Sequence, residues 1–243
     1  MKYAERLMRS MRSLGTIRIE TERLTLRRFY EEDAEMFFQN YGADPLVHRY
    51  VSFAPCKTIG GTRLFIHKHM RMYQSNDDFY GWAIVLDGIP IGSIGLFDVD
   101  RESESAEIGY SLGSAWWGKG YATEAVDAVL RFAFGEIGLH RVQATCHPEN
   151  TASERVLEKC GMVFEGTMRE AQLNPDGSRS DLKLYAVLAT DRRRCFLPLW
   201  MSSYSPMTET ISSSDSSPCT NIVSNQASSD ITLTPVSLQP FLR

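Results

Sequence analysis

The sequence predicts an α/β (α+β) domain with a mixed, mostly antiparallel central sheet, and three observations support this prediction. Short apolar runs alternate with amphipathic helical stretches across residues 17–191. Neighbouring apolar runs are separated by compact turn signals, as at Asp87-Gly88, which favours a hairpin. The resulting order of elements, β-α-α-β-β-β-α-β-α-β-β, combines hairpins with helical connections, which is typical of an α+β arrangement.

The first half of the domain is predicted to contain a strand, two helices and a three-stranded meander. Residues 23–29 alternate apolar and polar side chains, as a strand does, and acidic residues from Glu31 onward favour the N-terminal end of a helix. A second helical stretch covers about residues 58–75. The three strands are predicted at residues 80–86, 90–97 and 105–112.

The second half of the domain continues with single helices and strands in turn. A helix is predicted from Tyr121 to about Ile137, a strand over residues 141–147 and a helix over about residues 151–159. Two final strands, at about residues 162–171 and 181–189, flank the turn sequence Asn174-Pro-Asp-Gly177. The sheet is therefore expected to be flanked by about four helices.

Domain organisation follows from the length of the chain and from a change in its composition. A chain of 243 residues, of which 43% are hydrophobic, can form one sizeable core with extensions. From Ser202 onward, 17 of 42 positions are Ser or Thr and charges are sparse, so residues 192–243 are expected to be a disordered tail. The basic segment 1–16 is expected to be an extension of minor importance, with a weak amphipathic helix or a presequence as alternatives, which leaves residues 17–191 as the domain.

Composition argues against several classes of partner. The net charge of -4 gives no reason to expect DNA, and no apolar run reaches the roughly 18 residues needed to span a membrane. The five cysteines are odd in number and contain no CxxC pair, which favours a reducing cytoplasmic compartment over a disulfide framework or a zinc site. No metal site is expected, because the histidines form no ligand grouping with acids: His48, His67, His69, His140 and His147.

The stretch GSAWWGKGYATEA, from Gly113 to Ala125, places a glycine-flanked lysine directly before a predicted helix. Phosphate-binding loops have this character, and two of the known kinds match the stretch poorly. A nucleoside-triphosphate P-loop requires Ser or Thr after Lys119 to bind magnesium, and Gly120 stands there. The dinucleotide fingerprint requires a third small residue where Thr123 stands, and it requires a parallel βαβ unit, whereas antiparallel hairpins are predicted before this loop.

A third loop matches better. The (Arg/Gln)-x-x-Gly-x-(Gly/Ala) loop of the GNAT acyltransferases fits Trp117 to Ala122, apart from the tryptophan at its first position. Small residues permit the close approach of a pyrophosphate, and the free N–H groups and dipole of the following helix bind its charge without a metal. Lys119 would then be an accessory charge. An ordinary tight turn into a helix is the alternative for the glycines taken alone.

Six segments together give a more specific match: ETERLTLRRFYEEDAEMFF, IPIGSIGLFD, AEIGYSL, WWGKGYATEAV, LHRVQATCHPENTASERVLEKCGM and EGTMRE. Over about residues 21–189 the chain resembles the GNAT N-acetyltransferase superfamily, and within it the RimJ/RimL-like branch of ribosomal-protein N-terminal acetyltransferases. The resemblance implies the acyl-CoA N-acyltransferase fold, with a sheet splayed at the cofactor site, and acetyl-CoA as co-substrate. It implies cofactor contacts from Trp117, Gly118, Lys119, Gly120, Tyr121, Ala122 and Thr123.

Candidate catalytic groups lie on the predicted strand 105–112. Glu107 has apolar neighbours and precedes the cofactor loop, so a partly desolvated carboxylate there is a candidate general base for an ammonium acceptor, acting through water. The resemblance implies that this strand diverges from strand 141–147 after Glu107. Backbone amides near Ser111 and Leu112 would then bind the pantetheine arm and polarise the thioester oxygen. Alternatively, Glu107 simply points outward from an amphipathic strand.

The predicted helix 151–159 supplies the remaining candidates. Asn150 is a natural N-cap, and the resemblance implies that it also contacts the pantetheine region. Ser153 is a candidate to hydrogen-bond the departing sulfur, with a plain small helix residue as the alternative, and Arg155 is a candidate contact for the cofactor's 3′-phosphate. In many GNAT enzymes a tyrosine is the acid that protonates the thiolate, and this chain has Leu157 at that position. The acid is therefore expected to be either Ser153 or water.

These residues predict an N-acetyltransferase that transfers the acetyl group directly to a primary amine. No covalent enzyme intermediate is needed, because the amine is itself a sufficient nucleophile. The expected acceptor is a protein N-terminal α-amine, and a small-molecule amine such as a polyamine, amino acid or antibiotic is the alternative. A non-catalytic CoA-binding module is a third hypothesis, which the missing tyrosine favours and Glu107 disfavours. A monomer or a homodimer is expected.

Overall fold

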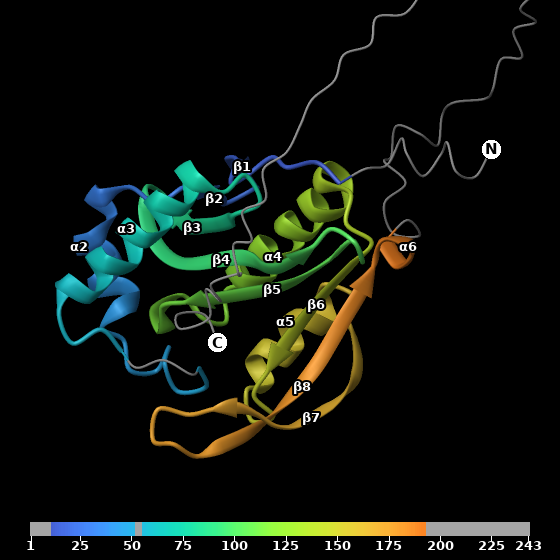
Figure 1. Cartoon of the computed structure of the whole chain (residues 1–243). Coiled ribbons are helices and arrows are strands. Elements are labelled where there is room, and N and C mark those ends of the chain that lie inside the picture. Colours follow the sequence, from blue (N-terminus) through green and yellow to red (C-terminus); the bar gives the residue numbers. More distant parts are fainter. Residues whose placement is uncertain (1–10, 52–54, 193–243) are drawn as a thin grey trace, which may run out of the picture. The chain divides into compact units, whose positions relative to one another are not determined.

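In the computed structural model, the described residues 11–51 and 55–192 form an eight-stranded sheet in the order β1-β2-β3-β4-β5-β6-β8-β7 (Figure 1). Neighbouring strands pair antiparallel except β5 and β6, which pair parallel. The strands are β1 (Ile19–Glu20), β2 (Leu24–Arg27), β3 (Tyr80–Leu86), β4 (Ile89–Asp100), β5 (Ser105–Leu112), β6 (Arg141–Cys146), β7 (Val163–Leu173) and β8 (Arg179–Leu188). The predicted mixed, mostly antiparallel sheet is confirmed.

Helices connect the strands at the predicted places. They are η1 (Glu31–Asp33), α2 (Ala34–Phe37), η2 (Phe38–Gly42), α3 (Ile59–Ser75), η3 (Ser114–Trp116), α4 (Tyr121–Phe132), η4 (Ala133–Ile137), α5 (Thr151–Lys159) and α6 (Ala189–Arg192). The helix predicted from Tyr121 is confirmed and ends in the wider turn η4, whereas the short helices η3 and α6 were not predicted.

Two hydrophobic cores hold the helices on opposite faces of the sheet. One core joins the sheet to α4 and α5 and includes the buried residues Trp82, Ile108 and Val129. The other core joins the sheet to α2, η2 and α3 through buried aromatic rings such as Phe29 and Phe37, whose centroids are 5.1 Å apart. Helices therefore pack on both faces of the sheet.

The hairpin between β3 and β4 turns at Asp87 and Gly88, as predicted. Their φ angles are 49° and 82°, both in the left-handed region that a type I′ hairpin turn requires. The predicted turn between β7 and β8 is also present, and in it the backbone N–H of Gly177 donates to the carbonyl oxygen of Asn174 at 3.0 Å.

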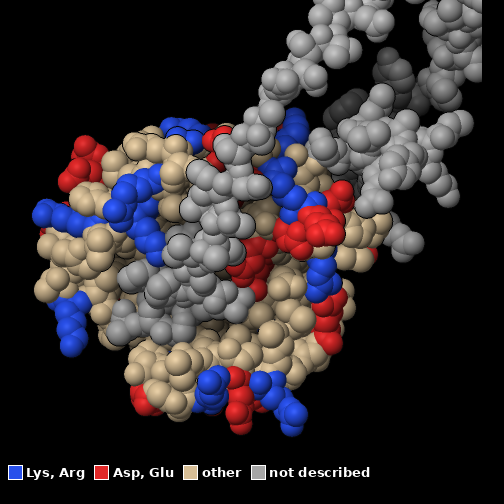
Figure 2. Space-filling model, viewed as in Figure 1, with Lys and Arg blue, Asp and Glu red and all other residues tan. Residues whose placement is uncertain are grey.

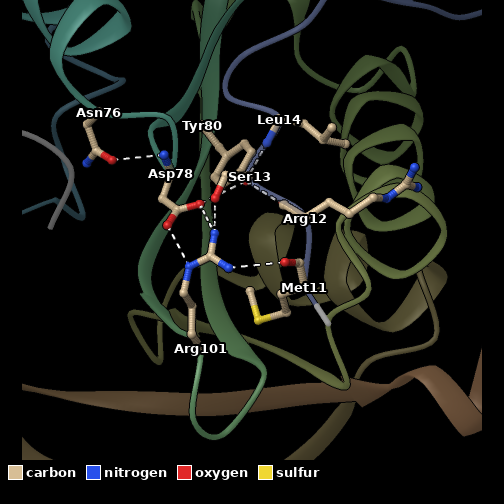
Figure 3. A network of polar contacts seen from close by, with 8 residues as sticks. All are labelled: Met11, Arg12, Ser13, Leu14, Asn76, Asp78, Tyr80 and Arg101. Carbon is tan, nitrogen blue, oxygen red and sulfur yellow. Dashed lines mark hydrogen bonds and ion pairs between the residues drawn. The ribbon is translucent and has the colours of Figure 1, made fainter. Parts of the chain in front are cut away.

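The chain before β1 packs against the sheet through apolar and polar contacts (Figure 3). Met11 and Thr16 are buried. Arg101 binds the backbone oxygen of Met11 at 3.1 Å and pairs with Asp78 at 2.6 Å, which ties this segment to the β4–β5 turn. Residues 11–16 are therefore part of the folded unit, so the packed chain begins before the start that the sequence predicted.

The predicted disordered tail lies outside the described residues apart from its first residue, as do Cys195, Cys219 and residues 1–10. Within the part of the chain that the structure describes, no helix is long and apolar enough to cross a membrane. The same residues contain no group of three or more His, Cys, Asp or Glu side chains arranged to hold a metal ion. Figure 2 shows basic and acidic side chains mixed over the viewed face, in keeping with the small net charge.

Candidate active site

The parallel strands β5 and β6 diverge and open the sheet in its middle, as predicted. Their pairing covers three positions and ends at Glu107, opposite Gln143. Beyond that position β5 continues to Leu112 along β4, whereas β6 continues to Cys146 along β8 (Figure 1). Among the described residues, the edge of β5 after Glu107 therefore has no strand partner, and its backbone can pair with an extended ligand.

Glu107 lies at the base of this opening. Its side chain is buried, with 8% of the residue exposed, so it does not point outward into solvent. The hydroxyl of Thr145 donates to its Oε1 at 3.0 Å, and the amide of Gln143 donates to its Oε2 at 3.4 Å. Since both donors come from β6, the carboxylate bridges the two strands at the point where they part. A carboxylate held in a fixed position beside an open strand edge has the placement that a general base requires.

The end of β5 is held by the loop that follows it. The indole N–H of Trp117 donates to the carbonyl oxygen of Leu112 at 2.8 Å, so the residue that departs from the Arg/Gln pattern fixes the strand end. Gly113 is required by a close approach, because a Cβ there would lie 2.0 Å from the backbone oxygen of Asn40. These contacts hold the open edge that includes Ser111, whose amide stays a predicted contact for the pantetheine arm.

The glycine loop turns the chain into α4 in a form that fits a pyrophosphate. Gly118 and Gly120 have φ angles of 73° and 84°, and Gly120 is the N-cap of α4. The amides of Tyr121, Ala122 and Thr123 form the first helical turn and have no acceptor within the helix. The positive end of the helix dipole adds to their attraction for an anion. The loop can thus bind phosphate through its backbone, without a metal ion.

Arg23 supports this loop, although it was not predicted as a site residue. Its Nη1 donates to the carbonyl oxygen of Lys119 at 3.0 Å, its Nη2 pairs with Glu124 at 2.6 Å, and its guanidinium lies 4.6 Å from the centre of the Tyr121 ring. No local pattern connects residues so distant in the chain. The ammonium of Lys119 itself donates to the carbonyl oxygen of Ala115 at 3.0 Å, so its role as an accessory phosphate charge stays a prediction.

The start of α5 lies across the opening from β5. Asn150 caps the helix as predicted, because its Oδ1 accepts the backbone N–H of Ser153 at 3.1 Å. The hydroxyl of Ser153 is 2.9 Å from the hydroxyl of Tyr110 on β5. Arg155 is exposed, and its contact with a 3′-phosphate stays a prediction. Leu157, at the position of the missing tyrosine, is fully buried in the core.

Tyr110 is a second residue at the site that was not predicted from the sequence. Burial raises its pKa above the ordinary value for tyrosine, so the hydroxyl keeps its proton. The sequence signal that could have found Tyr110 is its distance from Glu107. Side chains of a strand alternate between its two faces, so Tyr110, three residues after Glu107, lies on the opposite face, where α5 packs. Burial also raises the pKa of the Cys146 thiol, to about 11, which makes this cysteine a poor nucleophile.

Comparisons with known proteins bear on the same span of the chain. A family model described as an acetyltransferase (GNAT) domain matches residues 23–163. The N-acetyltransferase p20 of Bacillus licheniformis is 32% identical over 169 residues, which cover 69% of this chain and 94% of p20. YdaF of Bacillus subtilis, described as a candidate ribosomal N-acetyltransferase, is 34% identical over 106 residues, which cover 44% of this chain and 57% of YdaF.

A solved structure shows the same architecture. The acetyltransferase (GNAT family) from Bacillus anthracis aligns with a TM-score of 0.63 and 34% identity, and the match covers 72% of this chain and 99% of that chain. This likeness confirms the predicted fold. The span matched by the family model includes Glu107, the glycine loop and Ser153.

Proposed function

The chain belongs to the GNAT acetyltransferase family, and on this basis we propose that it acetylates the α-amino group of a protein N-terminus. It is an N-acetyltransferase that uses acetyl-CoA as the acetyl donor. The observation that carries the proposal is the buried carboxylate of Glu107 at the point where β5 and β6 part, beside the open edge of β5.

Glu107 is the proposed general base. An amine attacks a thioester only as the neutral species, so an ammonium acceptor first has to lose a proton. The carboxylate of Glu107 is positioned by Thr145 and Gln143, and it takes this proton directly or through one water. The amine nitrogen then forms the new C–N bond with the acetyl carbon, and the C–S bond breaks with its electron pair going to sulfur. The nitrogen loses its second proton to solvent, which leaves the neutral amide.

The backbone of the chain supplies the proposed binding groups. Amides near Ser111 and Leu112, on the open edge of β5, are suited to pair with the pantetheine arm and to stabilise the oxyanion of the tetrahedral intermediate. The amides that follow Gly120 are suited to hold the pyrophosphate. Cys146 is not proposed as an acetyl carrier, since its thiol stays protonated at neutral pH.

Two arguments favour an α-amine as the acceptor. An α-amino group has an ordinary pKa of about 7.7 to 8.0 and a lysine side chain one of about 10.4, so the α-amine is neutral far more often at pH 7. A single carboxylate base therefore suffices for an α-amine. The second argument is the similarity to YdaF, whose description names ribosomal N-acetylation.

An acceptor panel tests this proposal with the full chain. Release of the CoA thiol is followed with acetyl-CoA and each acceptor in turn, and the acetylated product is located by mass spectrometry. The panel contains peptides with a free N-terminus and no lysine, the same peptides blocked at the N-terminus with one lysine added, polyamines, and free amino acids.

Thiol release that requires a free peptide N-terminus, with the acetyl group on the α-nitrogen, is the expected result. Release with polyamines or amino acids alone would replace the protein acceptor by a small-molecule acceptor. Binding of acetyl-CoA without acceptor-dependent release across the panel would contradict the proposed acceptor class.

A further inference from the structure

A pair of hydroxyl groups joins β5, which lines the opening, to the start of α5. Tyr110 Oη lies 2.9 Å from Ser153 Oγ and 3.2 Å from the backbone oxygen of Ser153. Tyr110 belongs to the part of β5 beyond Glu107, where pairing with β6 has ended, and Ser153 belongs to the first turn of α5. The pair therefore joins the unpaired part of β5 to the first turn of α5.

The two sides of β5 carry different chemistry at this point. Glu107 and Tyr110 are three residues apart and so lie on opposite faces of the strand. Glu107 contacts Thr145 and Gln143, whereas Tyr110 contacts α5. A thioester bound along the open edge would thus have the carboxylate on one side and the hydroxyl pair on the other.

At 2.9 Å either hydroxyl of the pair can donate to the other, so the direction follows from the other contacts of the two groups. Among the described residues, the phenol of Tyr110 contacts two oxygen atoms of Ser153, and Oγ is nearer than the carbonyl oxygen. The Ser153 carbonyl also belongs to the hydrogen-bond ladder of α5, which leaves Oγ as the better acceptor for the phenol. When Tyr110 donates to Oγ, the proton of the serine hydroxyl points away from the phenol and is available to another acceptor.

The phenol is suited to remain the donor. Burial raises its pKa, and the titratable groups next to it are the thiols of Cys146 and Cys160. The acidic side chain on this turn of α5, Glu154, is engaged elsewhere, since Lys183 Nζ and Tyr185 Oη bind its Oε1 at 2.6 and 2.5 Å. The hydroxyl pair therefore has no carboxylate contact among the described residues that would reverse its direction.

We propose that Tyr110 is a positioning residue that directs the hydroxyl of Ser153 toward the sulfur of the departing CoA. This inference rests on the proposed function and names the group that stabilises the leaving thiolate, for which the chain has Leu157 in place of a tyrosine. As the C–S bond breaks, sulfur takes its electron pair and Ser153 donates a hydrogen bond to the thiolate. The first proton of the ammonium goes to Glu107, the second passes from the nitrogen to solvent as the amide forms, and solvent protonates the thiolate when CoA leaves.

The ionisation of bound CoA tests this role without any knowledge of the acceptor. The full chain is saturated with CoA, and the ultraviolet absorbance of the thiolate is titrated with pH. The same titration with desulfo-CoA, which lacks the thiol, is subtracted to remove the absorbance of the protein's own tyrosines and cysteines. Wild type is compared with Tyr110→Phe, Ser153→Ala and the double variant.

Both single variants are expected to raise the pKa of the bound thiol by about one to two units, because a hydrogen bond to a charged group is lost. The double variant is expected to equal Ser153→Ala, since the phenol acts through the serine. Tyr185→Phe is the matched control. It removes another tyrosine hydroxyl that contacts the same turn of α5, and it is expected to leave the bound-thiol pKa unchanged.

The outcomes separate this inference from the proposed function. An equal bound-thiol pKa in wild type and Tyr110→Phe, or additive shifts in the double variant, would overturn the positioning role while CoA binding and acetyl transfer stand. Failure of wild type to bind CoA would instead overturn the proposed function, and this inference with it. A thermal unfolding scan of each variant shows whether a shift comes from the lost hydroxyl or from a loosened fold, and a loosened Tyr110→Phe would count against the inference.

Discussion

Arg23 Nη2 lies 2.6 Å from Glu124 Oε2, although the two residues are 101 positions apart in the chain. Glu124 belongs to the first turn of α4, and Arg23 directly precedes β2, so the ion pair joins α4 to the sheet. The same guanidinium holds the carbonyl oxygen of Lys119. The conformation of the glycine loop therefore depends on a contact that is remote in sequence.

Replacing Arg23 with methionine should weaken acetyl-CoA binding. The change keeps a long apolar side chain but removes the contacts to Glu124 and Lys119, so the loop loses order before it binds phosphate. We expect the dissociation constant of acetyl-CoA, measured by isothermal titration, to rise about tenfold. Arg18→Met is the control, because it breaks an exposed ion pair with Glu20 away from the loop. Equal affinities in the two variants would show that the loop does not need this support.

A valine at Gly120 should abolish acetyl-CoA binding. The φ angle of 84° is strained for any residue with a Cβ, and that atom would lie 3.4 Å from Arg23 Nη2. Gly138→Val is the matched control, since Gly138 has a φ of 89° and a Cβ there meets nothing within 4 Å. Both changes should lower the free energy of unfolding by about 1 to 2 kcal/mol. Retained binding in Gly120→Val would contradict the placement of the pyrophosphate.

The elements of the domain could be predicted because each carries a local signal. The Asp87-Gly88 turn needs two residues that tolerate positive φ, and the helix after Gly120 shows apolar residues at helical spacing. The separation of β5 from β6 has no local signal. It was expected only from the resemblance to a known family, because strand pairing is decided by residues far apart in the chain.

Contacts between distant residues account for what the sequence did not reveal. Met11 lies in a basic segment with no clear pattern, yet its side chain is buried and its backbone oxygen is held by Arg101. Tyr110 was visible as one residue of an amphipathic strand, but its contact with Ser153 requires α5 to pack beside the opening. Such relationships depend on the packing of whole elements, which no short window of sequence contains.

Replacing Glu107 with glutamine should lower the turnover number without weakening acetyl-CoA binding. Glutamine keeps the size of the side chain but cannot take a proton, and a general base contributes a factor of about 100 to 10,000. We expect a loss within that range, measured by thiol release at saturating substrates. Glu102→Gln, in the exposed turn before β5, makes the same change of charge and should keep wild-type turnover. If Glu107→Gln keeps the wild-type turnover number across the pH range, Glu107 is not the base and only connects β5 to β6.

The buried imidazole of His69 should make the fold less stable in mild acid. His69 packs among the rings of Phe29, Phe65 and Phe79, and its Nδ1 lies 3.0 Å from the carbonyl oxygen of Phe65. Burial lowers its pKa from 6.5 to about 4. Between pH 4 and pH 6.5 the unfolded chain therefore carries a proton on His69 that the folded chain lacks. The stabilisation by the neutral, buried imidazole is fully present above pH 6.5, and the free energy of unfolding loses it as the pH falls toward 4.

Urea unfolding at pH 7 and pH 5 measures this contribution. In wild type the His69 proton should lower the free energy of unfolding by about 2 kcal/mol between the two values. His69→Phe removes the titrating group within an aromatic cluster, so its stability should fall less over the same range. Leu64→Gln is the control, because Leu64 is exposed on the same helix and carries no titrating group, and its variant should keep the wild-type dependence. The same fall in stability in His69→Phe as in wild type would mean that the imidazole is protonated in the folded state.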